Sequence, residues 1–209
     1  MGKGLETRER LLDIAEAAIL QKGFGGTSIE ELIAEAGITK SGFFYHFRDK
    51  NRLAHSLLER HLAQDERILN QIFGRARDLT DDPLHTFLVG LKLLAEMMAD
   101  LPDGHPGCLV TTYCYNERLF DQEIRDLNRQ AVLSWRVRFR GMIDDIHTRY
   151  APREEIDPQH LADMVATVIE GGIVMSKVLK DPAILPQQIL MLRSFIRLLY
   201  LAGGERDNE

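Results

Sequence analysis

The segment that decides the fold reads TKSGFFYHFRDK, residues 39–50. Thr39 is a residue type that caps helices, and Phe43 and Phe47 lie four positions apart, so a helix here would place both rings on one buried side. The stretch from Ala36 to Arg48 contains basic side chains and no carboxylate. The segment therefore predicts a short helix with one apolar side and one cationic, hydroxylic and aromatic side.

A second short helix is expected just before this one. Thr27 and Glu30 are typical of a capping box, in which Thr27 would accept a hydrogen bond from the first turn while Glu30 reaches back. Apolar residues then recur at helical spacing up to Gly37, a residue type that commonly ends helices. Two short helices joined by a tight turn that contains glycine indicate a helix-turn-helix.

The rest of the chain is helical in pattern as well, and no strand pattern competes with it. A long helix should begin near Asp49 and continue past Ile72, and the polar residues 74–82 are expected to form a linker before Pro83. The sequence predicts an all-α fold of about nine helices, with a three-helix domain over residues 1–50 linked by the long helix to a helical bundle over 51–209. The other expected helices cover residues 5–22, 83–101, 107–118, 121–150, 158–180 and 183–202.

Composition narrows the class of protein. The 209 residues are 44% hydrophobic and 28% charged, and their apolar runs are shorter than the roughly 18 residues that a membrane helix needs, so we expect a cytoplasmic globular protein. Residues 1–55 carry equal numbers of basic and acidic side chains, so the net charge of −6 belongs to the remainder. Cys108 and Cys114 are expected to be plain thiols, because on one helix they would point to different sides.

Residues 5 to about 55 resemble the TetR family of transcriptional regulators in both the order and the spacing of their motifs. The stretches that carry the resemblance are TRERLL at 7–12, GF at 23–24, TSI at 27–29, AGITK at 36–40 and FYHFRDK at 44–50. The sequence differs from the usual family pattern at Ser41-Gly42 and at Phe43-Phe44. The all-helical remainder has the length expected of the family's ligand-binding and dimerisation domain.

The resemblance implies a DNA-binding surface on the second short helix and at the ends of its neighbours. Thr27 or Ser28 and Lys50 would hold phosphates, and Phe44, which lacks the hydroxyl that is common there, would contact a thymine methyl group or a sugar. The residues expected to line the major groove are Thr39, Lys40, Ser41, Gly42, Tyr45 and His46.

A repressor of this kind reads successive major grooves as a two-fold dimer, so a homodimer surface is expected. The last two helices supply more apolar surface than one edge of a bundle needs, and two mid-helix glycines suggest close helix contact. The residues expected at this interface are Leu161, Val165, Val168, Gly171, Gly172, Leu185, Ile189, Leu192, Phe195 and Ile196.

A small-molecule inducer is the other expected partner, since operator DNA would be released when it binds. Methionines, aromatic rings and scattered hydroxyls between the central helices suit a largely apolar ligand with one or two polar anchors. The residues expected to wall this pocket are Phe87, Leu91, Leu94, Met98, Thr111, Thr112, Tyr115, Trp135, Phe139, Met142 and Met164. No cofactor is expected.

Two other classes of function are weaker alternatives. A helical-bundle enzyme would need a metal or nucleophile motif, but neither His147, His160 and Asp163 nor Glu117, Asp121 and Glu123 has the spacing of one, so no metal site is expected. An architectural DNA-binding protein without an inducer would be opposed by the acidic remainder of the chain, which repels wrapped DNA.

Overall fold

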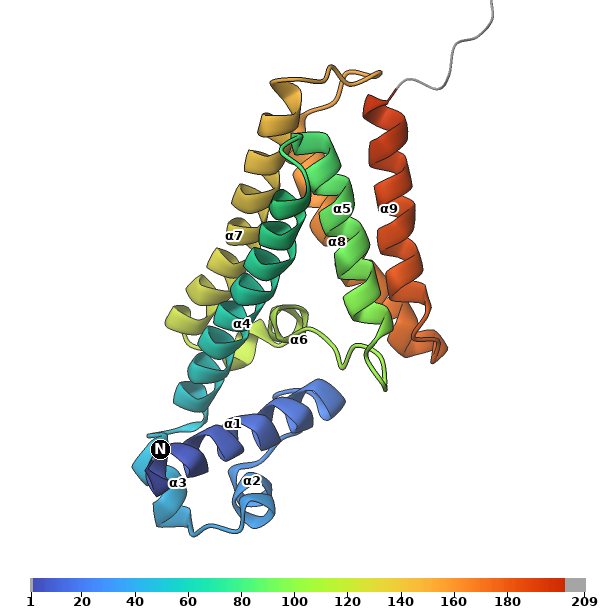
Figure 1. Cartoon of the computed structure of the whole chain (residues 1–209). Helices are drawn as coiled ribbons and strands as arrows, with labels where there is room; N and C mark the ends of the chain where they lie inside the picture. Colours follow the sequence, from blue (N-terminus) through green and yellow to red (C-terminus); the bar gives the residue numbers. More distant parts are fainter. Residues whose placement is uncertain (1, 202–209) are drawn as a thin grey trace, which may run out of the picture. The chain divides into compact units, whose positions relative to one another are not determined.

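The computed structural model describes residues 2–201, and within that range nine α-helices and one 3-10 helix are present and no strand is found (Figure 1). The predicted all-α fold is confirmed. The helices are α1 (Lys3–Lys22), α2 (Ile29–Ala36), α3 (Lys40–His46), α4 (Lys50–Leu79), α5 (Pro83–Ala99), α6 (Leu109–Tyr115), the 3-10 helix η1 (Glu117–Leu119), α7 (Gln122–His147), α8 (Pro158–Leu179) and α9 (Ile184–Tyr200). In the described range, no helix is both long enough and apolar enough to span a membrane.

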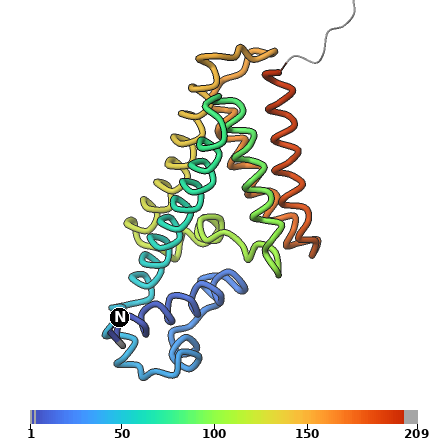
Figure 2. The backbone as a smooth tube through the Cα atoms, in the orientation of Figure 1, coloured from blue at the N-terminus to red at the C-terminus, as the bar shows by residue number. Residues whose placement is uncertain are grey.

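The chain forms two compact units, each assembled from two stretches of sequence. The first contains residues 1–66 and 106–132, and the second contains residues 67–105 and 133–209. The long helices α4 and α7 each contribute residues to both units, as the continuous tubes in Figure 2 show. The division at residue 50 remains a prediction about function, since compactness groups the residues by different boundaries.

Local hydrogen bonds account for the helix-turn-helix. Gly37 adopts a left-handed conformation (φ 63°) that ends α2, as its lack of a Cβ allows. Thr39 caps α3 as predicted, its Oγ1 accepting a hydrogen bond from the Gly42 amide at 3.1 Å. The predicted cap of α2 was one residue too early: Ser28 accepts the bond from the Glu31 amide, and Thr27 is buried and donates to the Gly23 carbonyl.

The core of the first unit joins the helix-turn-helix to residues from farther along the chain. Phe43 and Phe47 are buried as predicted, and the Arg60 guanidinium binds α1 through Asp13 and Glu16 at 2.7 and 2.6 Å. Rings from two distant stretches also meet here, since the centroid of Phe24 lies 6.3 Å from that of Tyr113. The Tyr113 hydroxyl donates to the Ala54 carbonyl of α4 at 3.0 Å, and burial raises the pKa of this tyrosine.

The second unit packs α5 and α8 against α9, and these helices run side by side in Figure 1. Its core includes the stacked rings of Phe73 and Phe87, with Phe139 meeting both edge-on. A Cβ on Gly90 would lie only 2.2 Å from the Phe73 ring, so α5 approaches α4 at a distance that only glycine permits.

Two predicted boundaries were wrong. Residues 74–79 continue α4 rather than forming a linker, because Ala76 is buried and keeps the helical spacing of the core, so the turn is confined to residues 80–82. The helix expected over 107–118 is shorter, and Cys108 stands before its first residue, which removes the premise that both cysteines share one helix. Cys108 is buried and Cys114 exposed, and no disulfide joins them.

Candidate DNA-binding surface and its surroundings

The outward side of α3 is the strongest candidate site in the first unit. With Phe43 and Phe47 in the core, Tyr45 is 82% exposed, and Phe44 is also exposed. Lys40 and Ser41 are exposed at the start of the helix, while Gly42 and His46 are half-buried. The structure therefore brings together on one side of the helix the hydroxyl, ammonium and aromatic groups predicted there.

Lys40 has a carboxylate beside it that comes from α2. Its Nζ lies 3.3 Å from Glu30 Oε1, and both side chains are mostly exposed. A hydrogen bond from the backbone of Glu30 and the nearby Lys40 ammonium lower the pKa of the Glu30 carboxyl. The stretch that lacks carboxylates in sequence is thus not free of them in space, and an incoming phosphate would compete with Glu30 for Lys40.

Lys50, which was predicted to hold a phosphate, has partners within the first unit. Its ammonium donates to the Phe24 carbonyl at 2.5 Å and lies 4.0 Å from the centroid of the Phe24 ring. Burial lowers the pKa of Lys50. Lys50 therefore connects the start of α4 to the turn between α1 and α2. The carbonyl and the ring together replace the water that the ammonium would otherwise bind.

Of the two predicted phosphate ligands before α2, Ser28 is exposed and Thr27 is buried. Because the Thr27 hydroxyl is directed to the Gly23 carbonyl, only Ser28 presents a side chain to solvent. Sequence reasoning placed Arg48 in the basic stretch but not in the site, although its side chain is 90% exposed and only 3.6 Å from Asp49 Oδ2.

The apolar residues expected to form the dimer interface mostly serve the core of the second unit. Phe195 and Gly171 are exposed and Val168 is half-buried, so only these three could contact a partner. The others are buried within the unit, where α8 and α9 pack on each other and α9 packs on α5. The interface residues that prove to be buried are Leu161, Val165, Gly172, Leu185, Ile189, Leu192 and Ile196.

A different apolar face of α8 and α9 is exposed. On α8 it includes Val174, Met175 and Val178 at helical spacing, and on α9 it includes Met191 and Leu198 with Phe195 between them. This exposed apolar face is defined by those six residues with Leu179 and Leu190. The sequence could have indicated it, since both helices are apolar on more sides than one bundle requires.

The predicted ligand pocket is divided between the units. Thr111, Thr112 and Tyr115 belong to the first, and Tyr115 is 85% exposed, so it does not wall an enclosed cavity. In the second unit, four members of the predicted set are buried and four are half-buried. The buried ones are Phe87, Leu91, Leu94 and Phe139, and the half-buried ones are Met98, Trp135, Met142 and Met164.

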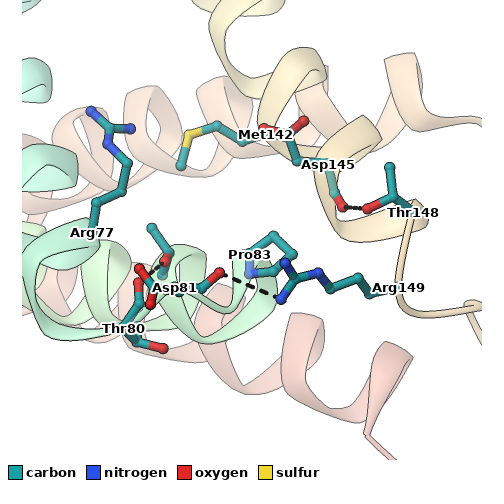
Figure 3. A pocket seen from close by; sticks show the side chains of 9 residues that line it. Arg77, Thr80, Asp81, Pro83, Met142, Asp145, Thr148 and Arg149 are labelled. Atoms are coloured by element: carbon teal, nitrogen blue, oxygen red, sulfur yellow. Dashed lines mark hydrogen bonds between the residues drawn. The ribbon is translucent and has the colours of Figure 1, made fainter.

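A cavity of about 360 Å³ in the second unit includes one of these residues, Met142. Its other walls come from the end of α4, the following turn, the start of α5 and the end of α7 (Figure 3). Most of the lining side chains are charged or hydroxylic, which differs from the apolar pocket that was predicted.

Three of the residues weighed for an enzyme have partners within their own unit. His147 shares a hydrogen bond with the Tyr200 hydroxyl at 2.7 Å, and Asp163 forms an ion pair with Arg136 at 2.7 Å. Glu123 contacts Arg52 and His55. Over residues 2–201, no group of three or more histidine, cysteine or acidic side chains is arranged to hold a metal ion.

Comparison with known proteins gives a consistent result. Residues 11–57 match the family described as bacterial regulatory proteins, tetR family. The HTH-type transcriptional repressor NemR of Escherichia coli (strain K12) is 37% identical over 77 residues, which are 35% of this chain and 39% of NemR. The repressor BepR of Brucella suis biovar 1 is 31% identical over 94 residues, 45% of this chain and 44% of BepR. The match spans less than half the length of either repressor.

The fold similarity extends much farther than the sequence similarity. The crystal structure of a TetR-family transcriptional regulator from Agrobacterium tumefaciens superposes with a TM-score of 0.78 over 95% of this chain and 100% of that one, at 14% identity. A TetR transcriptional regulator from Chloroflexus aurantiacus gives a TM-score of 0.77 over 97% and 100% of the two chains, at 24% identity. The helices beyond the matched N-terminal segment therefore have the arrangement found in those regulators.

Proposed function

Because the chain belongs to the TetR family of bacterial regulatory proteins, we propose that it is a transcriptional repressor that binds a palindromic operator as a homodimer. The observation that carries the proposal is the outward side of α3. A helix that enters the major groove must bury one side and present donors and rings on the other, as α3 does with Phe43 inward and Tyr45 outward. Such a protein acts in the cytoplasm, where the chromosome lies.

In this proposal, Lys40 and Arg48 hold phosphates while Ser41, Tyr45 and His46 read base edges. Both cations are exposed and each has a single acidic neighbour at 3.3 Å or more. Exposed ion pairs of this kind contribute about 0–1 kcal/mol, so exchanging the carboxylate for a phosphate costs little. Phe44 supports apolar contact with a thymine methyl group, since its ring is partly exposed next to Tyr45.

The homodimer is proposed to form through the exposed apolar face of α8 and α9. A contiguous apolar surface rimmed by polar residues is typical of a protein interface. Gly171 supports this assignment, because it lies one helical turn before Met175 and costs the isolated helix about 1 kcal/mol. Within residues 2–201, an added Cβ would have no neighbour within 4 Å apart from the adjoining residues and backbone of α8. A second copy that approaches closely at Gly171 would explain why a side chain is missing there.

Release of DNA by a small molecule is proposed to operate through α4. This helix starts directly after α3 and contributes residues to both units, so a change in its position alters the recognition helix. Within the first unit, the Tyr113 hydroxyl donates to the Ala54 carbonyl of α4, and the Tyr113 ring meets Phe24 edge-on. The Phe24 carbonyl in turn accepts a hydrogen bond from Lys50. A ligand that shifts α4 would favour a state in which two recognition helices cannot enter successive grooves.

The experiment that tests the DNA-binding function is selection of random double-stranded DNA by the purified protein, followed by titration of the enriched sequence. Lys40→Ala is the test variant and Lys92→Ala the matched control, since Lys92 is also exposed and paired with one glutamate, Glu96, at 3.5 Å. We expect a palindromic site whose affinity falls about tenfold in Lys40→Ala and is unchanged in Lys92→Ala. A protein that enriches no sequence over bulk DNA contradicts the proposal.

A DNA-binding protein without an inducer is the remaining alternative within the same class. The cavity in the second unit favours a ligand-responsive protein over this alternative. Screening for small molecules that weaken operator binding while the dimer persists separates the two, and a ligand that splits the dimer contradicts the mechanism through α4.

A further inference from the structure

The cavity of about 360 Å³ in the second unit has an unusual balance of charge. Arg77 and Arg149 supply two guanidinium groups, and Asp81 and Asp145 supply two carboxylates (Figure 3). All four belong to the second compact unit, so the site lies within one folded body. The cavity therefore offers groups of both signs to one occupant.

These four side chains are not used to neutralise one another. Over residues 2–201, no ion pair within 4.0 Å joins either arginine to either aspartate. The contact between Arg149 and Asp81 is a 3.5 Å hydrogen bond to the main-chain carbonyl, and Asp145 likewise accepts the Thr148 hydroxyl through its carbonyl. Charged groups that border a cavity without pairing keep their full capacity to bind an occupant.

Asp82, directly next to Asp81, is an aspartate whose carboxylate is used to stabilise the fold. Its carboxylate caps α5 at the His85 amide, meets the His85 ring at 2.8 Å and accepts the Tyr150 hydroxyl at 2.7 Å. Burial opposes ionisation, but these hydrogen bonds prevail and lower the pKa of Asp82 to about 2. The Asp81 side chain has none of these contacts and is exposed, so it is available to an occupant of the cavity.

The same contacts make the cavity preformed. The bond from Tyr150 to Asp82 fixes the segment after α7 against the start of α5, and the Thr86 hydroxyl holds the Thr80 carbonyl at 3.0 Å. The turn at residues 80–82 is fixed further by the Asp82 amide, which donates to Thr80 Oγ1 at 3.2 Å. The backbone that carries Asp81 is therefore held in place before a ligand binds, which lowers the entropic cost of binding.

We propose that this cavity binds a small α-amino acid as a zwitterion. A carboxylate matches a guanidinium in a paired, charge-assisted geometry, and an ammonium matches an aspartate. All four charged side chains are exposed, so each can turn toward an occupant at the mouth of the cavity. An ion of a single sign would leave two like charges facing it, and an apolar ligand would leave all four charges without a partner. Met142 and Pro83 add apolar contacts for the side chain of the amino acid. The volume lies at the small end of ligand sites, which span about 300–1,000 Å³.

The test measures binding by the full chain without DNA. The probes are the twenty common amino acids. Those without an ionisable side chain are each tested beside the N-acetyl derivative, which is only an anion, and the methyl ester, which is only a cation. An amino acid that binds should raise the Tm by about 3 °C at a concentration ten times its Kd, and both derivatives should bind at least tenfold more weakly. Failure of all twenty to shift the Tm, or equal binding of a derivative, overturns the proposal.

Matched variants place the ligand in the cavity. Arg77→Gln and Asp145→Asn should each weaken binding about tenfold, because each removes one charged contact. Their controls are Arg75→Gln and Asp144→Asn, which change an exposed residue of the same type on the same helix outside the cavity lining. Equal losses in the controls would mean that the amino acid binds elsewhere, which also overturns the assignment.

An effector role for this site rests on the proposed repressor function, but the binding test does not. If the protein selects no operator while the amino acid still binds in these assays, the proposed function fails and the site stands. If the operator is found and the amino acid binds, a change in operator affinity of at least fivefold supports the effector role. Unchanged affinity overturns that role.

Discussion

The outward side of α3 and the exposed apolar face of α8 and α9 are both surfaces that their own unit leaves uncovered, yet they differ in chemistry. The first presents Lys40, Ser41 and Tyr45, groups that hydrogen-bond or stack. The second presents only aliphatic, thioether and phenyl side chains such as Val178 and Met191. The difference indicates different partners. Cations and hydrogen-bond donors bind a polyanion such as DNA, whereas an apolar surface gains most when a second apolar surface covers it and excludes water.

The largest expected effect comes from a charge on the apolar face. Val178→Glu should weaken the dimer more than 100-fold, because the two-fold axis introduces two carboxylates and each lost valine contact is worth about 1.5 kcal/mol or more. The matched control is Val137→Glu on α7, since Val137 is 71% exposed and Val178 is 73% exposed. Sedimentation of the variants measures the change.

Equal dissociation of Val137→Glu and Val178→Glu would show that added charge, and not the position of the charge, weakens the dimer. A stable dimer of Val178→Glu would show that the two copies meet through another surface. Either result would contradict the proposal that the exposed apolar face of α8 and α9 forms the dimer interface.

The next effect concerns the polar surface. Tyr45→Ala should lower operator affinity about tenfold or more, since each subunit loses a contact worth roughly 1 kcal/mol, while the free energy of unfolding stays unchanged because the ring is exposed. Tyr115→Ala is the control, because Tyr115 is equally exposed in the same unit but lies on α6. Fluorescence anisotropy with operator DNA measures both, and an equal loss in the control would contradict the assignment of α3.

These two surfaces also show what the sequence could and could not predict. On α3, few residues are apolar, so the spacing of Phe43 and Phe47 identifies the buried side and, by exclusion, the outward side. On α8 and α9, apolar residues lie on several sides, and spacing alone cannot separate a residue such as Ile189, which packs within the chain, from Met191, which does not. Helix identity was predictable from local pattern, whereas the choice between two apolar sides depends on contacts far apart in sequence.

The contacts of Lys40 and Lys50 illustrate the same limit within the polar site. Their partners, Glu30 and Phe24, lie 10 and 26 residues away, and only the packing of the first unit brings them together. The cavity in the second unit was missed for a related reason. Its charged residues come from two stretches, 77–81 and 145–149, that lie more than 60 residues apart, so no local sequence pattern contains both.

A smaller and opposite pair of effects should separate the two sides of α8. Gly172→Ala should destabilise the subunit by about 1–3 kcal/mol, because its Cβ would lie 2.9 Å from Leu185 Cδ1 and 3.3 Å from Leu185 Cα. Gly171→Ala should instead stabilise the subunit by about 1 kcal/mol, since nothing lies within 4 Å. Urea unfolding in the Val178→Glu background measures the subunit alone.

In the wild-type background, Gly171→Ala should weaken the dimer although it stabilises the subunit. A methyl group there would separate the two copies at their closest approach. A variant that gains both subunit stability and dimer affinity would show that Gly171 faces solvent in the dimer.

The smallest expected effect is a difference in salt dependence between two cations, Arg48 just after α3 and Lys50 at the start of α4. Arg48→Gln should reduce the steepness of the salt dependence of operator binding by about two, one phosphate contact from each subunit. Lys50→Gln should leave that slope unchanged, because the Lys50 ammonium is held by the Phe24 carbonyl and ring, and should instead lower the free energy of unfolding by about 1 kcal/mol. Titrations at several salt concentrations measure the slopes. A slope that falls equally in both variants would show that Lys50 leaves Phe24 for a phosphate when DNA binds. Lys50 would then belong to the DNA-binding surface together with Lys40 and Arg48.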